Sequence, residues 1–179
     1  MLQAREALDV PAGWRAEILG EGIVLTPAPA SWRHAIADRM HRALVLALGE
    51  EWSICQGLAV SIPERARVYE PDFAVVPRSD LVASAVPHLP ASGIALAAEI
   101  VSRGNARMDR VEKLWGYGHG GVPLYLLIDR FDPDGPSVTL LSDPANGHYR
   151  QHHQVPFGKT IELPQPIGIT LETGEVSRP

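Results

Sequence analysis

Two apolar segments, separated by a stretch with helical spacing, constrain the fold of this chain more than any other feature. Residues 94–101 are almost continuously apolar, interrupted only by Glu99, and residues 122–129 form a second apolar run. Near-continuous apolar runs are typical of strands that are covered on both faces. Ser102 or Asn105 can cap a helix between the two runs. The pattern therefore predicts a strand–helix–strand unit whose strands are parallel neighbours joined by a right-handed crossover.

The remaining segments predict a mixed-sheet α/β (α+β) domain. Apolar ends around a short Gly-containing link predict a β-hairpin at residues 14–26. Residues 32–48 predict a helix, because apolar side chains recur there at helical spacing. Further strands are predicted at residues 52–62, 67–76, 137–142, 148–155 and 160–163, and a loop rich in Pro and Ser at residues 77–92.

Size and composition fit one compact domain. The chain has 179 residues and is 45% apolar, which is enough to bury a core. We expect an N-terminal arm at residues 1–13 and a single domain at residues 14–179. The single cysteine, Cys55, excludes an internal disulfide framework and a cysteine-based zinc site, and it fits a reducing compartment.

Targeting signals and charge limit the partners. The N-terminal residues lack the apolar segment of a signal peptide, and no apolar run approaches the length of a membrane span. We therefore expect a cytoplasmic protein without a membrane partner. The net charge of -5 argues against broad affinity for nucleic acid, so such binding would need a local basic patch. Candidates for that patch are Arg103, Arg107, Arg110 and Lys113.

Two carboxylates are candidates for a metal pair. Glu99 lies in an apolar run, where burying a carboxylate is costly without a partner or a cation. Asp72 stands at the start of another apolar segment, directly after Pro71. Hard divalent cations such as Mg²⁺ take one or two carboxylates, and the peptide oxygen of Ile100 is a candidate further ligand. The ordinary alternatives are a salt-bridged core glutamate for Glu99 and a turn residue for Asp72.

Lys113 is the candidate cation of the site. It lies four residues after Asp109 and four before Tyr117, so that the three share one strip of the predicted helix. A lysine beside a metal can stabilise charge on a reacting phosphate. The alternative is a surface ion pair between Asp109 and Lys113, worth about 0.3 kcal/mol. On a helical wheel, Lys113 also lies opposite an apolar stripe that includes Val111.

Other polar groups have ordinary explanations. His34 and His41, with Asp38 between them, resemble a loose metal cluster, but a polar helix face explains them better. The arginines of the predicted helix could hold phosphates, although their spacing alone favours a solvated face. The segment 118–121 follows a helix and so is not a phosphate loop.

Several short motifs follow one another in a specific order. They are EPDFAVV at residues 70–76, AEIVS at 98–102, DRVEK at 109–113 followed by Tyr117, and GVPLYLLID at 121–129. Upstream, AEIL at residues 16–19 and His34 match an N-terminal strand and helix. In this order the motifs resemble the Uma2 family of restriction endonucleases, a branch of the PD-(D/E)XK nuclease superfamily. The resemblance covers roughly residues 14–142 and implies a restriction-endonuclease-like mixed β-sheet core flanked by helices.

The resemblance implies a divalent metal, Mg²⁺ with Mn²⁺ as a substitute, bound by an acidic pair. Asp72 matches the first acid and Glu99 the second. The usual lysine of the superfamily would fall at Val101, which this chain has in its place. The resemblance implies that a lysine on the following helix replaces it, and Lys113 matches that position.

Further residues are implied by the same resemblance. Glu17 matches an accessory acid, and Asp109 and Tyr117 match residues that orient the helix lysine. Glu21 lies in a link that departs from the usual turn of the family, so no role is assigned to it.

The sequence thus leads to one main hypothesis and two alternatives. The first is a metal-dependent DNA endonuclease that acts as a homodimer, since cutting both strands usually needs two sites. The second is a catalytically silent nucleic-acid-binding or scaffold protein, favoured by the acidic charge and by Val101. The third is a metal phosphoesterase that acts on small nucleotides. The first requires that Asp72, Glu99 and Lys113 meet in a cleft that is open to water.

Overall fold

The computed structural model of the chain describes residues 2–12, 14–19, 22–26, 31–62, 66–83 and 88–173. A six-stranded sheet forms its centre, in the order β11-β10-β9-β8-β6-β3. The strands are β3 (Trp52–Cys55), β6 (Phe73–Pro77), β8 (Leu96–Ile100), β9 (Leu124–Asp129), β10 (Ser137–Ala145) and β11 (His148–Pro156). β8 and β9 are parallel, and the other neighbours are antiparallel. The predicted mixed sheet and its parallel pair are confirmed.

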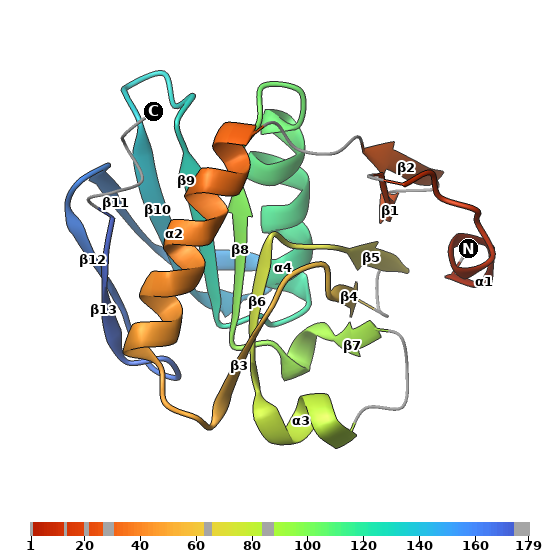
Figure 1. The fold of residues 1–179 in the computed structure, drawn as a ribbon, viewed down its shortest axis with the longest axis horizontal. Coiled ribbons are helices and arrows are strands. Elements are labelled where there is room, and N and C mark those ends of the chain that lie inside the picture. The colour runs from red at the N-terminus through yellow and green to blue at the C-terminus, as the bar shows by residue number, and fades with distance from the viewer. Residues whose placement is uncertain are drawn as a thin grey trace.

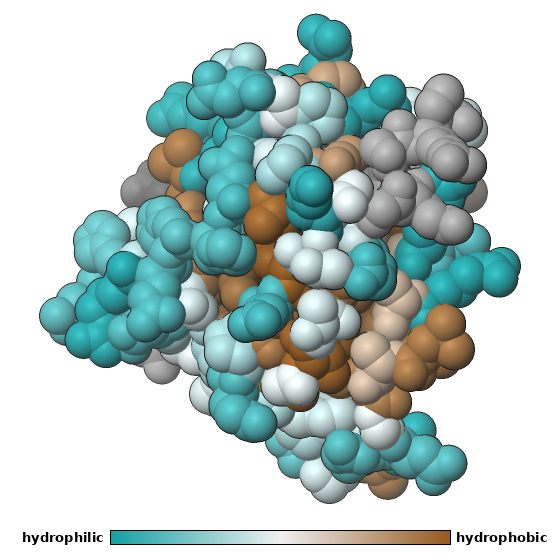
Figure 2. All heavy atoms as spheres, turned by 90° about the vertical axis from the view of Figure 1, so that its left-hand side faces the viewer, coloured by the Kyte–Doolittle hydropathy of each residue, from teal (hydrophilic) through white to brown (hydrophobic). Residues whose placement is uncertain are grey.

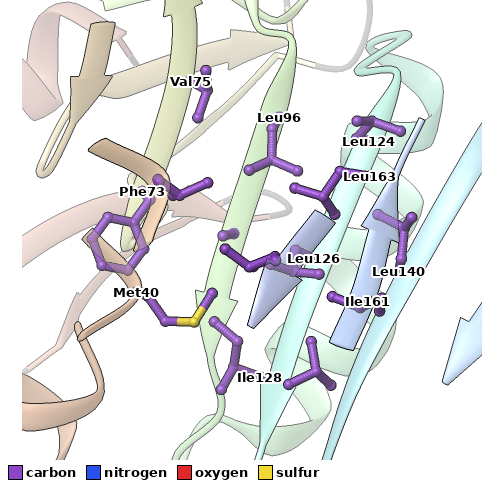
Figure 3. Close-up of a cluster of buried hydrophobic side chains, with 14 of the residues drawn as sticks. Met40, Phe73, Val75, Leu96, Leu124, Leu126, Ile128, Leu140, Ile161 and Leu163 are labelled. Carbon is purple, nitrogen blue, oxygen red and sulfur yellow. The ribbon is translucent and has the colours of Figure 1, made fainter. Parts of the chain in front are cut away.

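One face of this sheet is covered by helix α2 (Ser31–Ala47), which the sequence predicted at residues 32–48. Ile36, Met40 and Leu44 recur at helical spacing and are buried against the sheet. The hairpin of β12 (Thr160–Leu163) and β13 (Ile169–Glu172) covers the same face beside α2 (Figure 1). Figure 3 shows this core, in which the labelled side chains are Met40, Phe73, Val75, Leu96, Leu124, Leu126, Ile128, Leu140, Ile161 and Leu163.

The other face is covered by a second sheet and by the helical segment that joins β8 to β9. The second sheet has the order β2-β1-β5-β4-β7, formed by β1 (Arg15–Leu19), β2 (Gly22–Thr26), β4 (Ala59–Ile62), β5 (Arg67–Tyr69) and β7 (His88–Pro90). The joining segment consists of a π-helical part, η3 (Met108–Lys113), and the α-helix α4 (Leu114–His119). Tyr69, Ala97 and Tyr117 are among the residues of this second core. Every residue of β8 is buried, as expected for a strand that is covered on both faces.

A groove of about 780 Å³ lies between the β10–β11 pair and the β12–β13 hairpin. Figure 2 shows this side of the molecule, where apolar residues lie in a hollow with hydrophilic rims. Leu140, Leu163 and Ile169 line the groove together with His152 and Glu162. Because the hairpin lies on the α2 side of the sheet, this groove is separated from the face that Glu99 and Lys113 occupy.

Two predicted strands are each divided between the two sheets. The segment 52–62 forms β3 and β4, with Gly57 at φ 68° in the link between them. A positive φ suits glycine and does not fit a continuous strand. The segment 67–76 forms β5 and β6, separated at Pro71, which has no amide hydrogen to donate to a ladder. The prediction of single continuous strands was therefore wrong, although Pro71 does mark the entrance to β6.

The predicted loop at residues 77–92 also contains ordered elements. These are α3 (Arg78–Ala83), β7 and the 3₁₀ turn η2 (Ala91–Gly93). β7 pairs in parallel with β4, so a short segment of mixed composition becomes the edge of the second sheet. A three-residue strand is too short for a periodic pattern to reveal it.

The N-terminal segment forms a short helix, α1 (Leu2–Glu6), which contacts β1. Arg5 forms an ion pair with Glu70, and its Nε donates a hydrogen bond of 2.8 Å to the carbonyl of Ala16. These contacts attach the expected arm to the strands beside the candidate site. Among the helices of the described ranges, none is both long and apolar enough to cross a membrane.

Candidate active site

Asp72 and Glu99 lie on neighbouring strands and face the same side of the sheet. β6 and β8 are antiparallel, with Phe73 opposite Ala98 and Ala74 opposite Ala97. Continuing this register by one residue sets Asp72 opposite Glu99. Alternate residues of a strand share a face, and directly opposed residues have Cβ atoms about 4.5–5.5 Å apart. The predicted acidic pair is therefore brought together on the face that η3 and α4 cover.

Lys113 reaches the same point from η3. Its Nζ lies 2.9 Å from Oε1 of Glu99, 2.8 Å from Oε1 of Glu17 and 3.8 Å from Oδ1 of Asp109. The side chain of Lys113 is 1% exposed, so the ammonium group is enclosed by the carboxylates. We call Glu17, Glu99, Asp109 and Lys113 the lysine–carboxylate cluster. Its four members come from β1, β8 and η3, which are distant in the sequence.

The burial of Lys113 reverses what the helical wheel indicated. Val111, expected on the apolar stripe, is 54% exposed, whereas Lys113 faces the sheet. The segment 108–113 is π-helical, so its side chains are not spaced at the 3.6 residues per turn that the wheel assumes. Segments of this kind often occur at functional sites, where they turn a side chain toward the position that it must occupy.

The two predicted partners of Lys113, Asp109 and Tyr117, both contact the cluster, but only Asp109 contacts Lys113 itself. Asp109 approaches Lys113 itself, as the strip of residues predicted. Tyr117 instead donates a hydrogen bond of 3.1 Å from its hydroxyl to Oε1 of Glu99. Burial raises the pKa of Tyr117 well above its ordinary value, so the phenol remains a neutral donor. One oxygen of Glu99 therefore accepts from both Lys113 and Tyr117.

Burial dominates the electrostatics of the two inner carboxyl groups. It raises the pKa of Glu99 to about 8, although Lys113 acts in the opposite direction, and nearby Asp109, Asp72 and Glu17 add to the rise. It also raises the pKa of Asp109 to about 6, again against the effect of Lys113. A carboxyl group whose charge is opposed by burial and by neighbouring carboxylates binds a proton or a cation readily.

Arg33 is a member of the site that sequence reasoning missed. Its Nη2 forms an ion pair with Oδ2 of Asp72, and the same oxygen accepts a hydrogen bond of 2.7 Å from the amide of Ile100. Arg33 precedes Ile36 by three residues and so continues the buried stripe of α2 by one turn. That spacing is the signal that could have identified it, but an arginine in a first helical turn is ordinarily assigned to solvent.

His34 lies outside the lysine–carboxylate cluster. It is exposed on α2, one position from Arg33 and outside the buried stripe. Asp38 pairs with Arg42 at 3.0 Å on the exposed surface, and the ring of His41 packs 6.3 Å from that of Phe73. The structure therefore places His34 outside the buried cluster, and its contribution to the site stays a prediction.

The predicted basic patch is also rearranged. Lys113 is buried in the cluster, and Arg110 is held by a 2.7 Å ion pair with Asp129. Arg103 and Arg107 remain exposed. The four cations therefore do not form one continuous surface.

Glu17 has a second fixed contact besides Lys113. Its Oε1 accepts a hydrogen bond of 2.9 Å from the amide of Glu70, which links β1 to the segment before Asp72. The carboxylate side chain is 2% exposed. The resemblance alone suggested Glu17, and the structure places it in direct contact with the lysine.

The donor set suits a hard cation, but the cluster is closed. Oε2 of Glu99 and Oδ2 of Asp109 are buried and accept no hydrogen bond from any residue that the structure describes. Buried carboxylate oxygens are normally satisfied, and a cation would satisfy these. Within the described ranges no group of three or more His, Cys, Asp or Glu side chains is arranged to hold a metal. A metal at Asp72 and Glu99 would therefore take its other ligands from water and phosphate.

Among the residues that the structure describes, Asp72, Glu99 and Lys113 do not open together to water as expected. Glu99 is 0% exposed and Lys113 1%, and Arg33 covers Asp72, whose side chain is 11% exposed. The three predicted residues converge as expected, but a substrate phosphate can reach Glu99 only if neighbouring side chains move.

Comparison with known proteins agrees with the family that the motifs resemble and with the fold described above. The model of the Uma2 family, described as "Putative restriction endonuclease", matches residues 2–174. Among solved structures, the chain is similar to a protein from Anabaena variabilis described as a putative nuclease belonging to DUF820. The TM-score is 0.78 at 15% sequence identity, with 98% of this chain and 96% of that chain covered. At this identity the likeness shows the fold alone. No curated protein matches the chain.

Proposed function

Because the chain belongs to the Uma2 family, whose description is a restriction endonuclease, we propose that it is a metal-dependent endonuclease that hydrolyses phosphodiester bonds of DNA. One observation supports this proposal above the others. Lys113 Nζ lies 2.9 Å from Glu99, and the strand register sets Asp72 opposite Glu99. Two carboxylates and an ammonium group on one face are the groups that such a reaction needs.

Asp72 and Glu99 would hold Mg²⁺, and Mn²⁺ could take its place. When bound, such a cation supplies Lewis acidity toward a phosphodiester oxygen and makes an attacking water more acidic. The unpartnered Oε2 of Glu99 is the atom best placed to serve as a ligand. Since metal ligands must be ionised, binding would release the proton that burial favours on Glu99.

The residues of the chain then have separate tasks. The ammonium group of Lys113 stabilises the negative charge that develops on the reacting phosphate. Glu17 and Asp109 position Lys113, because both carboxylates lie within 4 Å of its Nζ. Tyr117 fixes the orientation of Glu99 through its hydrogen bond to Oε1.

Access to these groups requires movement of Arg33. Its guanidinium pairs with the outer carboxylate, Asp72, and lies in the first turn of α2. A substrate phosphate can compete for this arginine, because guanidinium binds phosphate as well as carboxylate. Transfer of Arg33 from Asp72 to the phosphate would free the carboxylate for the metal as the substrate arrives.

Cleavage of plasmid DNA in Mg²⁺ or Mn²⁺ tests the proposal. We expect Asp72→Asn, Glu99→Gln and Lys113→Met each to lower the rate by at least about a hundredfold, the usual cost of removing a charge-stabilising group. The matched controls are Asp80→Asn and Lys159→Met, which remove the same charges at exposed positions. Circular dichroism spectra would establish that each variant is folded. Activity that survives in the site variants would contradict these roles.

The alternative is a catalytically silent nucleic-acid-binding or scaffold protein on the same fold. Two observations favour it: Arg33 already neutralises Asp72, and Glu99 is wholly buried. Calorimetric titration with Mn²⁺ distinguishes the two functions. Heat of binding that disappears in Asp72→Asn supports the endonuclease, whereas no heat together with salt-sensitive DNA binding supports the silent protein.

A homodimer in a reducing cytoplasm completes the proposal. Two active sites are needed to cut both strands together, and β11 is a nine-residue edge strand of the central sheet. An exposed edge can pair with the same edge of a second copy, and a dimer of this kind would place two active sites in one assembly. The free thiol of Cys55 is a separate observation, and it agrees with a reducing compartment. Sedimentation equilibrium would report the state of assembly.

A further inference from the structure

Four side chains stack at one edge of the central sheet. The rings of Trp32 and Phe131 meet edge to face, with centroids 5.5 Å apart. The guanidinium of Arg103 lies 4.8 Å from the centroid of Phe131, and that of Arg130 lies 5.1 Å from Trp32 and 5.8 Å from Phe131. We call these residues, Trp32, Phe131, Arg103 and Arg130, the arginine–aromatic stack.

The stack lies beside the candidate active site. Trp32 precedes Arg33, which pairs with Asp72. Arg103 follows β8 by three residues, and Arg130 directly follows β9. In Figure 1 the start of α2, the end of the β8 arrow and the connection from β9 to β10 all lie along the upper edge of the sheet. A chain that crosses this edge would pass over both the stack and Asp72.

The support beneath the stack is fixed by hydrogen bonds. The amide of Phe131 donates to Oδ1 of Asp129 at 2.9 Å, and Nη2 of Arg110 donates to the carbonyl of Phe131 at 2.9 Å. Arg110 is itself paired with Asp129 at 2.7 Å. These contacts fix the backbone that carries the Phe131 ring, against which the guanidinium groups of Arg103 and Arg130 pack.

Arg103 and Arg130 remain available to an anion. Both are exposed, and neither forms an ion pair with a carboxylate in the part of the chain that the structure describes. An arginine that lies over an aromatic ring keeps its N–H edge free for bidentate hydrogen bonds. The stacking also reduces the side-chain freedom that would be lost on binding. Both features favour a phosphate oxygen pair as the ligand.

We propose that Arg103 and Arg130, supported by Trp32 and Phe131, bind the phosphate backbone of DNA beside the scissile bond. The identity of the polymer rests on the proposed endonuclease function. This contact would supply local positive charge on a chain whose net charge is -5. Because the contact is to the backbone, it would position the substrate without reading its base sequence.

Equilibrium binding of a fluorescent DNA duplex in EDTA, which prevents metal-dependent cleavage, tests this proposal. We expect the double variant Arg103→Ala/Arg130→Ala to bind at least about tenfold more weakly, because two charge-assisted contacts are lost. The slope of log affinity against log salt concentration should fall by about 2, or about 1 for each phosphate contact. The double variant Arg103→Lys/Arg130→Lys keeps both charges but loses the planar guanidinium groups. Its affinity should lie between that of the unaltered protein and that of the double alanine variant.

The matched control is Arg42→Ala/Arg150→Ala. It removes the same charge from exposed arginines, each of which pairs with an aspartate outside the stack. Its affinity and salt slope should remain close to those of the unaltered protein. Melting temperatures of all variants would show whether a loss of binding arises from unfolding.

The outcomes separate this proposal from the proposed function. No DNA binding by the unaltered protein in EDTA, or equal losses in the stack variant and the control, would overturn the stack as a DNA contact. Cleavage that persists together with such a result would leave the endonuclease function in place. Conversely, binding that depends on Arg103 and Arg130 without any cleavage in Mg²⁺ or Mn²⁺ would overturn the endonuclease and retain the stack.

Discussion

Glu99 shows how a single buried carboxyl group links stability to pH. Its pKa rises from the reference value of 4.5 to about 8 on folding, chiefly because burial opposes its charge. The folded protein therefore binds this proton more tightly than the unfolded chain does. The resulting stabilisation is fully present below the unfolded pKa and is lost as the pH rises through about 8. Asp109, whose pKa rises from 3.8 to about 6, acts in the same direction.

We therefore predict that, without metal, the free energy of unfolding falls by a few kcal/mol between about pH 5 and about pH 8. Glu99→Gln, which cannot ionise, should remove much of this fall and leave the part contributed by Asp109. Urea unfolding in EDTA at a series of pH values measures how the free energy of unfolding changes with pH. Glu162→Gln, at an exposed position of β12, is the control and should retain the full fall. Parallel curves for Glu99→Gln and the unaltered protein would contradict the prediction.

At the scale of residues, the sequence indicated the acids better than the cations. Glu99 and Asp72 could be found because each interrupts or begins an apolar segment, and burial of such a group is costly without a partner. Arg33 could not be found in this way, since its partner lies 39 positions away and only the fold brings them together. The contact of Glu17 with Lys113 likewise depends on pairing between distant strands, which no local pattern encodes.

At the scale of elements, the packing of α4 against β5 depends on Gly116. A Cβ atom at this position in α4 would lie 2.3 Å from both Cε2 and the hydroxyl oxygen of Tyr69. Tyr69 is fully buried, donates a hydrogen bond of 3.3 Å to the carbonyl of Glu112, and packs with its ring centroid 5.2 Å from that of Tyr117. It therefore has no free space into which to move.

We predict that Gly116→Ala destabilises the protein by about 1–3 kcal/mol, the usual effect of overpacking a core, in spite of the higher helix propensity of alanine. Differential scanning calorimetry measures the change. Gly104→Ala is the matched control, because a Cβ there meets nothing within 4 Å, and it should alter the melting temperature little. An unchanged or raised melting temperature for Gly116→Ala would show that α4 does not hold Tyr69 as described.

The same scale explains which elements could be predicted. Residues 94–101 and 122–129 gave strands because long apolar runs leave few alternatives, and α2 has a buried stripe that spans about three turns of helix. The strands that divide at Gly57 and Pro71 kept their β character across the break, so the pattern did not show that the chain changes sheets there. The π-helical turn of η3 has no signature in residue type, and for that reason the side that Lys113 faces was misjudged.

At the scale of the whole molecule, the fold could be predicted further than the accessibility of the site. A mixed sheet with a parallel pair follows from the order of apolar segments, and the central sheet has both features. The closure of the lysine–carboxylate cluster follows from how β1, β8 and η3 pack, which a linear pattern does not specify. The cluster holds three carboxyl groups around one ammonium group, so its unbalanced charge in the absence of metal weakens the native state.

This imbalance leads to a prediction about the stability of the whole molecule. A ligand that binds only the folded state stabilises it by about 2.7 kcal/mol at a concentration one hundred times its dissociation constant. Saturating Mg²⁺ should therefore raise the melting temperature by about 5–10 °C for a domain of this size, and Mn²⁺ should act similarly. The increase should disappear in Asp72→Asn and persist in Asp80→Asn, which loses the same charge at the exposed surface of α3. A melting temperature that still rises with Mg²⁺ in Asp72→Asn would show that the cation binds elsewhere on the molecule. That result would contradict the assignment of Asp72 as a ligand.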